Sequence, residues 1–310
     1  MGLSLLELIF ISKKIKIQTM EKITKEILKE VFPERPKEKY FKKYDFGLLI
    51  VIGGSDFYSG SPALVAMAAF RSGVGMVRII APKRSADIIA SFSPNLAAYP
   101  LEGKWLNKDH LPILFEMTES AKLVAENKVA VAIGGGLGRA KETQEVIIEY
   151  LSKIDVPVVI DADAIYAVAK KPEIIFGKNF LFTPHPYEFF VLTGRKVHQL
   201  PFEEQVKIVK EEAERLKTVI LLKGKPDIIT NGKEIALCEA GTPYMAVGGT
   251  GDTLTGICGA LAARKIDLFL VAKAGAFLNG RAGEIAAQKF KDGLTATDVI
   301  EAIPEVLKEI

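Results

Sequence analysis

The segment LLIVIGGSDFYSGSPALVAMAAFRSG (48–73) decides the fold. Five consecutive apolar residues lead into a glycine-rich loop, and a run of mostly small residues with helical character follows. A strand without alternation of apolar and polar residues is typical of a parallel sheet that is covered on both faces. The segment therefore predicts a strand–loop–helix unit of an α/β protein.

Similar units recur along the rest of the chain. The other apolar runs lie at 75–80, 129–133, 156–160, 180–182 and 218–224. Their alternation with helical segments predicts a three-layer α/β/α fold around a central, mostly parallel sheet. Ligands of such sheets bind beyond the carboxyl ends of the strands, where this sequence has its Gly, Asp, His and Lys residues. The pattern therefore favours an enzyme or a nucleotide-binding protein.

The composition excludes several classes of protein. Of 310 residues, 49% are hydrophobic and 25% charged, which is ordinary for a globular chain. Because 41 basic residues nearly balance 38 acidic ones, we expect no nucleic-acid partner. No stretch is long and apolar enough to predict a membrane span. The two cysteines form no C-x-x-C pair, which predicts reduced thiols in a cytoplasmic protein.

We expect two parts along the chain. Residues 47–310 form the α/β domain, and residues 1–46 form an N-terminal extension and a lead-in helix. The apolar stretch 3–12 has no basic segment before it, so it does not predict a signal peptide. Met20 opens a cleaner helical segment and is a candidate for the natural start.

The sharpest motif is GGTGD (248–252), immediately before a helical run. Glycines let backbone N–H groups approach an anion, and a helix N-terminus adds unpaired donors and positive partial charge. Asp252 either caps the helix or takes a proton from a hydroxyl beside this anion hole. The small residues that follow favour the second role, because they permit close packing around a ligand.

Two further loops are rich in glycine. GGSDFYSG (53–60) and GGGLG (134–138) each follow an apolar strand. Each is either a tight turn or a backbone surface against a ligand. Neither is a P-loop, and GGGLG lacks the full context of a dinucleotide-binding G-x-G-x-x-G.

Four charged or titratable residues stand at predicted strand ends. Asp161 and Asp163 could organise a hydrated magnesium ion or a charged loop, and Asp163 could instead cap a helix. His185 is mounted rigidly between two prolines and points to the predicted ligand face. Lys223 either meets a nucleotide phosphate or is a solvated strand terminus.

Taken together and in this order, GGS-x2-Y-x-G, GGGLG, DADAI, TPHPYE, LKG and MAVGGTGD resemble the NAD(P)H-hydrate dehydratases. The resemblance runs from about Lys42 to the C-terminus and implies the ribokinase-like fold. It also implies a lyase that restores NADH and NADPH from their hydrates, NADHX and NADPHX. In that reaction ATP or ADP, with Mg²⁺, phosphorylates the ring hydroxyl, and phosphate is then eliminated.

The resemblance also implies the site residues. Asp252 is the catalytic base, and the N–H groups of Thr250 and Gly251 form the anion hole. The substrate contacts are Ser61, Gly136, Gly138, His185 and Asp252. The nucleotide contacts are Lys223, Gly224, Lys225, Pro226, Asp227 and Gly251. No metal ligand is assigned.

Three positions depart from the family pattern. Ser61 stands where Ala is common, Gly135 where Pro is common, and Tyr187 where Gly is common. The first two residues are small. Tyr187 is bulky and calls the shape of the loop near His185 into question.

Several expectations concern the wider context. Residues 1–46 are too few for the epimerase domain that many relatives carry, so we expect any epimerase to be a separate protein. Apolar helices predict a homo-oligomer. Two alternatives are a small-molecule alcohol kinase of the same fold, whose product keeps its phosphate, and a non-catalytic nucleotide sensor. Asp252 argues against the sensor, because a sensor needs no base.

Overall fold

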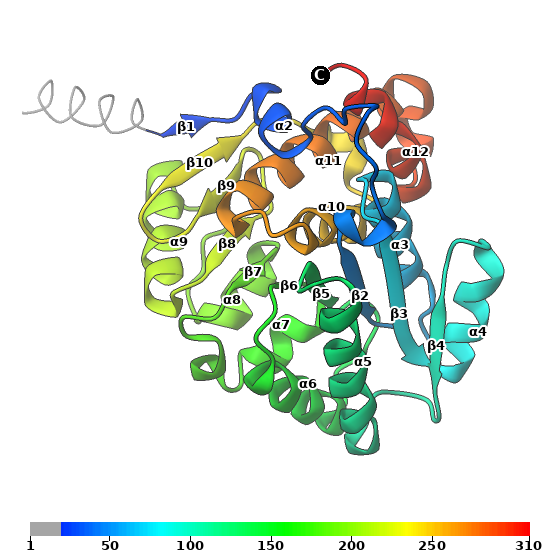
Figure 1. Ribbon diagram of the computed structural model, residues 1–310. Coiled ribbons are helices and arrows are strands. Elements are labelled where there is room, and N and C mark those ends of the chain that lie inside the picture. Colours follow the sequence, from blue (N-terminus) through cyan, green and yellow to red (C-terminus); the bar gives the residue numbers. More distant parts are fainter. Residues whose placement is uncertain (1–19) are drawn as a thin grey trace, which may run out of the picture.

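The computed structural model describes residues 20–310, so the predicted extension over 1–19 lies outside the described residues. A central sheet is covered by helices on both faces (Figure 1). Its ten strands run in the order β1-β10-β9-β8-β7-β6-β5-β2-β3-β4. The predicted three-layer α/β/α arrangement is confirmed. No helix in this part of the chain combines the length and apolar character needed to cross a membrane.

The strands are β1 (Glu21–Lys22), β2 (Leu48–Ile52), β3 (Met76–Pro82), β4 (Ala98–Leu101), β5 (Val129–Ile133), β6 (Val158–Ile160), β7 (Phe180–Phe182), β8 (Val219–Leu222), β9 (Asp227–Thr230) and β10 (Ile235–Cys238). The α-helices are α2 (Glu26–Val31), α3 (Gly60–Arg71), α4 (Lys83–Phe92), α5 (Leu111–Val124), α6 (Lys141–Lys153), α7 (Asp163–Val168), α8 (Pro186–Thr193), α9 (Phe202–Leu216), α10 (Thr250–Ala263), α11 (Leu268–Phe290) and α12 (Ala296–Leu307).

Pairing is parallel from β4 through β3, β2, β5, β6 and β7 to β8. Strands β8, β9 and β10 pair antiparallel, and the β9–β10 hairpin turns at the predicted Asn231–Gly232. Two edge strands were not predicted. β4 contains Pro100, which an edge strand tolerates, and β1 adds two residues in parallel beside β10.

Alternation along the strands divides the core into two layers. In β2, Leu49 and Val51 face one side, while Leu48, Ile50 and Ile52 face the other. The first side packs against α2, α3, α4, α10, α11 and α12, and the second against α5 to α9 (Figure 1). Because α2 and β1 join this same core and sheet, residues 20–46 pack on the domain, and the predicted boundary at residue 46 stays a prediction.

Helices α3 and α10 approach each other closely at Gly256. A Cβ added there would lie 2.2 Å from the carbonyl oxygen of Val65 and 2.9 Å from the Cβ of Ala68. The first of these is a backbone atom of α3 that cannot rotate away. The small residues of both helices therefore hold α10 against α3, and α10 carries GGTGD at its start.

We expect Gly256→Ala to destabilise the protein despite the better helix propensity of alanine. The gain is about 1 kcal/mol, whereas overpacking against a backbone atom costs about 1–3 kcal/mol. Denaturant unfolding measures the net change. Gly293→Ala is the matched control, because a Cβ there meets nothing within 4 Å. A Gly256→Ala protein as stable as this control would contradict the close-packing argument.

Candidate active site

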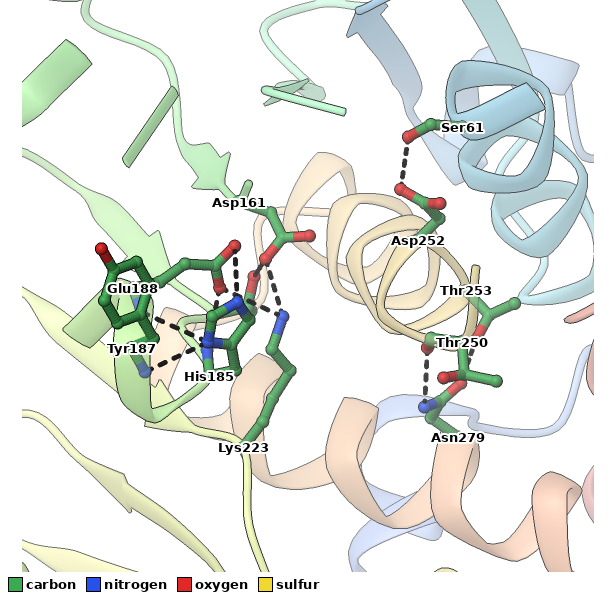
Figure 2. A network of polar contacts seen from close by, with 11 residues as sticks. Ser61, Asp161, His185, Tyr187, Glu188, Lys223, Thr250, Asp252, Thr253 and Asn279 are labelled. Carbon is green, nitrogen blue, oxygen red and sulfur yellow. Dashed lines mark hydrogen bonds and ion pairs between the residues drawn. The ribbon is translucent and has the colours of Figure 1, made fainter. Parts of the chain in front are cut away.

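The loops after β2, β5, β6, β7 and β8 converge on the first turn of α10. These strands are neighbours in the sheet and parallel, so their carboxyl ends share one edge. Figure 2 shows the polar side chains that these loops and helices bring to this edge. The predicted location of the site at the strand ends therefore coincides with a cluster of interacting charges.

Asp252 lies in the first turn of α10 and accepts a short hydrogen bond from Ser61 Oγ of α3 (Figure 2). Burial raises the pKa of Asp252 to about 6. The Ser61 hydrogen bond opposes that rise, the charge of Asp161 adds to it and the charge of Lys223 opposes it. A carboxylate of this kind is ionised at neutral pH and is still basic enough to accept a proton.

The two glycine-rich loops close over this carboxylate. A Cβ on Gly135 would lie 1.8 Å from Ser61 Oγ and 3.0 Å from Asp252 Oδ1. The N–H of Gly54 donates to the carbonyl oxygen of Gly135 over 2.9 Å. The loops are thus both tight turns and a backbone wall beside Asp252. Next to it, Gly136 has a φ of 71° and faces Tyr58.

Lys223 joins two carboxylates at the ends of neighbouring elements (Figure 2). Its Nζ lies 3.0 Å from Asp161 Oδ1 and 3.7 Å from Glu188 Oε2. Burial alone would lower the pKa of Lys223, but the two carboxylates raise it above its ordinary value. Burial raises the pKa of Glu188, and Lys223 partly offsets that rise. The Lys223 ammonium also lies 3.4 Å from the position of a Cβ on Gly251, beside the predicted anion hole.

His185 caps α8 with its ring. Nδ1 accepts hydrogen bonds from the N–H groups of Tyr187 and Glu188, at 3.1 and 3.3 Å. The N–H of His185 donates in turn to Glu188 Oε2 over 2.9 Å. Because Nδ1 accepts, a neutral ring carries its proton on Nε2. Tyr187 keeps its backbone in this cap and leaves its side chain 59% exposed, so its bulk does not displace His185.

Asp161 and Asp163 face different partners. Asp161 Oδ1 accepts from Lys223 and, over 2.9 Å, from Thr183 Oγ1. Asp163 accepts from the N–H of Gly138 and from Nε of Arg139, both at 2.9 Å. The sequence left three roles open for Asp163: a magnesium ligand, part of a charged loop, or a helix cap. In the structure Asp163 is part of a charged loop with Gly138 and Arg139. Its side chain makes no helix-capping hydrogen bond.

A cavity of about 450 Å³ opens on the other side of Gly251. The residues that line it from the predicted nucleotide segment are Lys223, Gly224, Lys225 and Asp227; Pro226 does not line it. Asp227 Oδ1 accepts from the N–H of Gly224 over 2.7 Å, and burial raises the pKa of Asp227 to about 7. Lys225 Nζ donates to the carbonyl oxygens of Glu239 and Gly241. Four residues of the segment and Gly251 therefore line the same cavity.

The sequence analysis missed the residues behind the predicted anion hole. Asn279 of α11 is buried, and its Oδ1 lies 2.5 Å from Thr253 Oγ1 (Figure 2). Its Nδ2 donates to the carbonyl oxygen of Thr250 over 3.3 Å. The sequence signal was an Asn-Gly pair inside an otherwise apolar helical run. These contacts hold the first turn of α10 in place.

The donor set limits how magnesium could bind. Within residues 20–310, no group of three or more His, Cys, Asp or Glu side chains could hold a metal ion. Mg²⁺ is usually held by one or two carboxylates, water and substrate phosphates. Asp161 Oδ2 fits that role, since the hydrogen bonds from Thr183 and Lys223 go to Oδ1. The site can thus offer a carboxylate oxygen to a cation that arrives with phosphates.

Fold and site together define an α/β domain of the ribokinase-like superfamily, whose solved structures share this architecture. A family model described as NAD(P)H-hydrate dehydratase matches residues 49–305. The chain belongs to the NAD(P)H-hydrate dehydratase family, as the motifs of the sequence indicated.

Three similar proteins illustrate the match. The bifunctional NAD(P)H-hydrate repair enzyme Nnr of Pyrobaculum aerophilum is 40% identical over 86% of this chain and 52% of its own length. The ADP-dependent (S)-NAD(P)H-hydrate dehydratase of Nitrosopumilus maritimus is 32% identical over 92% of this chain and 96% of its own. A crystal structure of the Bacillus subtilis ADP/ATP-dependent NAD(P)H-hydrate dehydratase, co-crystallised with ATP and Mg²⁺, has a TM-score of 0.74, 25% identity and coverages of 94% and 98%. The chain spans about half the length of the bifunctional relatives it matches.

We expect Lys223→Met to destabilise the fold by about 3–5 kcal/mol, because it leaves two buried carboxylates without their cation. Without the ammonium, the pKa of Glu188 rises further, so the deficit shrinks as the pH falls and this carboxylate takes up a proton. Thermal unfolding between pH 5 and 8 measures both effects. Lys207→Met, which removes an exposed ion pair with Glu211, is the control and should change little. Equal effects of the two variants would contradict this account.

Proposed function

We propose that the chain catalyses the nucleotide-dependent dehydration of NADHX and NADPHX to NADH and NADPH. The observation that carries the proposal is the buried carboxylate of Asp252, hydrogen-bonded by Ser61 at the start of a helix whose first N–H groups face a cavity. Family membership supports it. So do the names of the similar Nitrosopumilus and Bacillus proteins, which describe dehydratases that depend on ADP or ATP.

In the proposed reaction, Asp252 takes the proton of the ring hydroxyl as its oxygen attacks the terminal phosphorus of ATP or ADP. The bond to the leaving nucleotide breaks, and negative charge builds on the phosphoryl oxygens. The N–H groups of Thr250 and Gly251, with the Lys223 ammonium, stabilise that charge. Magnesium bound to the nucleotide would neutralise phosphate charge, with Asp161 as the protein ligand. The phosphorylated ring then loses phosphate and a proton from the neighbouring carbon, which restores the double bond.

The remaining assignments follow from this reaction. Ser61, Gly136, Gly138 and His185 contact the hydrated dinucleotide, and His185 can donate through Nε2–H. The segment 223–227 and Gly251 contact the phosphoryl donor. The proposal further includes a homo-oligomer in the cytoplasm.

The test of the reaction is direct. Purified protein is incubated with NADHX, Mg²⁺ and either ATP or ADP, and NADH absorbance is followed together with phosphate release. Recovery of NADH with stoichiometric phosphate establishes the reaction and identifies the donor. A stable phosphorylated product without phosphate release would overturn the proposal in favour of an alcohol kinase.

We expect Asp252→Asn to keep the fold and nucleotide binding but to lower kcat by about 10²–10⁴-fold, as removal of a general base does. The asparagine oxygen can still accept the hydrogen bond of Ser61, so the geometry is preserved. Calorimetric titration with ATP and steady-state kinetics separate binding from turnover. A kcat close to that of the unchanged protein would remove Asp252 from the mechanism.

The acid limb of the pH–rate profile should report Asp252. The base must be ionised, so kcat/KM should fall as the pH drops through about 6. Ser61→Ala removes a hydrogen bond that lowers this pKa, so we expect the limb to move to higher pH while the rate at pH 8 is largely retained. Ser152→Ala, an exposed serine on α6, should leave the profile unchanged. If the acid limb does not move in Ser61→Ala, the Ser61 hydrogen bond does not influence the pKa that limits the rate.

A further inference from the structure

A second cavity lies beyond the glycine loop that covers Asp252. It measures about 470 Å³, and Phe57, Lys104, Trp105, Gly138 and Arg139 are among its lining residues. It shares none of its lining residues with the cavity of the nucleotide segment. Asp252 and the residues assigned to the phosphoryl donor do not line this cavity, and of the residues assigned to the hydrated dinucleotide only Gly138 does.

Two aromatic side chains are presented to solvent at this cavity. Phe57 is 90% exposed and Trp105 is 46% exposed. Their loops are tied together, because the N–H of Asp56 donates to the carbonyl oxygen of Lys104 over 2.6 Å. Arg84 Nη1 also donates to the carbonyl oxygen of Asp56, at 2.5 Å. Backbone hydrogen bonds thus fix the loops that carry Phe57 and Trp105, although both rings remain largely exposed to solvent.

The cavity combines aromatic faces with cations. Aromatic rings stack on nucleobases, and Lys and Arg bind phosphate. Lys104 stands on the rim next to Trp105 and is exposed. Arg139 is oriented by Asp163 at Nε and by the ring of Tyr166, 3.5 Å from its guanidinium carbon. This chemistry fits a purine nucleoside that carries phosphate.

The glycine loop links the cavity to the reacting centre, because Gly135 lines the recess of Asp252 and Gly138 lines the cavity. The position of a Cβ on Gly135 lies 3.0 Å from Asp252 Oδ1, and that of Gly136 lies 3.1 Å from the Tyr58 ring. The ring of Phe57 lies beside the ring of Tyr58, with the two centroids 6.1 Å apart. A dinucleotide has two riboses and a pyrophosphate between its bases, so a substrate whose nicotinamide ring lies at Asp252 extends along such a wall.

We propose that the cleft of Phe57, Trp105, Lys104 and Arg139 binds the adenosine half of the dinucleotide substrate. The base stacks on the aromatic pair, and the two cations bind phosphate. This inference rests on the proposed function, because it takes the substrate to be a dinucleotide.

The first test uses Trp105, the one tryptophan of the sequence. Its fluorescence is titrated with NADP⁺, ADP-ribose and nicotinamide mononucleotide, in the presence of saturating ATP to fill the donor cavity. We expect NADP⁺ and ADP-ribose to change the emission and nicotinamide mononucleotide to leave it unchanged. Unchanged emission at high NADP⁺ would overturn the inference.

The second test measures KM for the hydrate. Loss of one base–aromatic stack in Phe57→Ala should raise KM about tenfold at nearly constant kcat, because it removes binding common to ground and transition states. Phe176→Ala is the matched control, since Phe176 is 45% exposed but precedes the amino end of β7, whereas the site lies at the carboxyl ends of the strands. Equal KM values in the two variants would overturn the inference. A changed elution volume of Phe57→Ala with unchanged KM would instead mark a subunit contact.

The source of the bound phosphate is tested with Lys104→Gln, with exposed Lys170→Gln as control. A higher KM for NADPHX alone assigns Lys104 to the 2′-phosphate, and a higher KM for both hydrates assigns it to the pyrophosphate. KM values equal to the control for both would remove Lys104 from the cleft's function. If no hydrate is repaired but NADP⁺ still changes Trp105 emission, the proposed function fails while adenosine binding in the cleft stands.

Discussion

The ion pair between Lys223 and Asp161 is the interaction on which the rest of the site depends. It joins the ends of β8 and β6 across β7, and Glu188 at the start of α8 completes it. With Asp252 nearby, the cluster holds three carboxylates and one ammonium. Such a site repels phosphate unless carboxylates are protonated or further cations arrive. The raised pKa of Glu188 meets part of that need, and a nucleotide that brings its own cation would meet the rest.

A second constraint is the close approach of backbone to backbone around Asp252. Gly53 and Gly135 pack so tightly that a Cβ on Gly53 would lie 2.7 Å from the carbonyl oxygen of Gly135. At Gly256 the backbones of α10 and α3 approach each other just as closely, so that a Cβ there would also meet a backbone oxygen. Since interiors with few voids transmit small displacements, these contacts fix the carboxylate relative to both glycine loops. Glycine here is a packing requirement as much as a conformational one.

The sheet was predictable from sequence because strands buried on both faces are uninterrupted apolar runs, as 48–52 and 129–133 are. β1 was not, because two polar residues carry no periodicity and pair only through tertiary contact with β10. In the site, Asp252 and Lys223 stood out at the ends of elements. Glu188 and Asn279 did not, because their surroundings depend on helices α8 and α11 packing against other elements. Local sequence indicates what sits at a strand end, and only the fold decides which partners meet it.

The order of residues along the first turn of α10 divides the site into two sides. Thr250 and Gly251 line the cavity formed with the segment 223–227, whereas Asp252 lines the recess with Ser61 and Gly135. The first backbone N–H groups of a helix point along its axis, whereas its side chains point outward, so one turn can present anion-binding N–H groups and a carboxylate in different directions. In the proposed reaction the donor enters from the first side and the hydroxyl from the second. That placement sets the attacking and leaving oxygens on opposite sides of the phosphorus, as phosphoryl transfer requires.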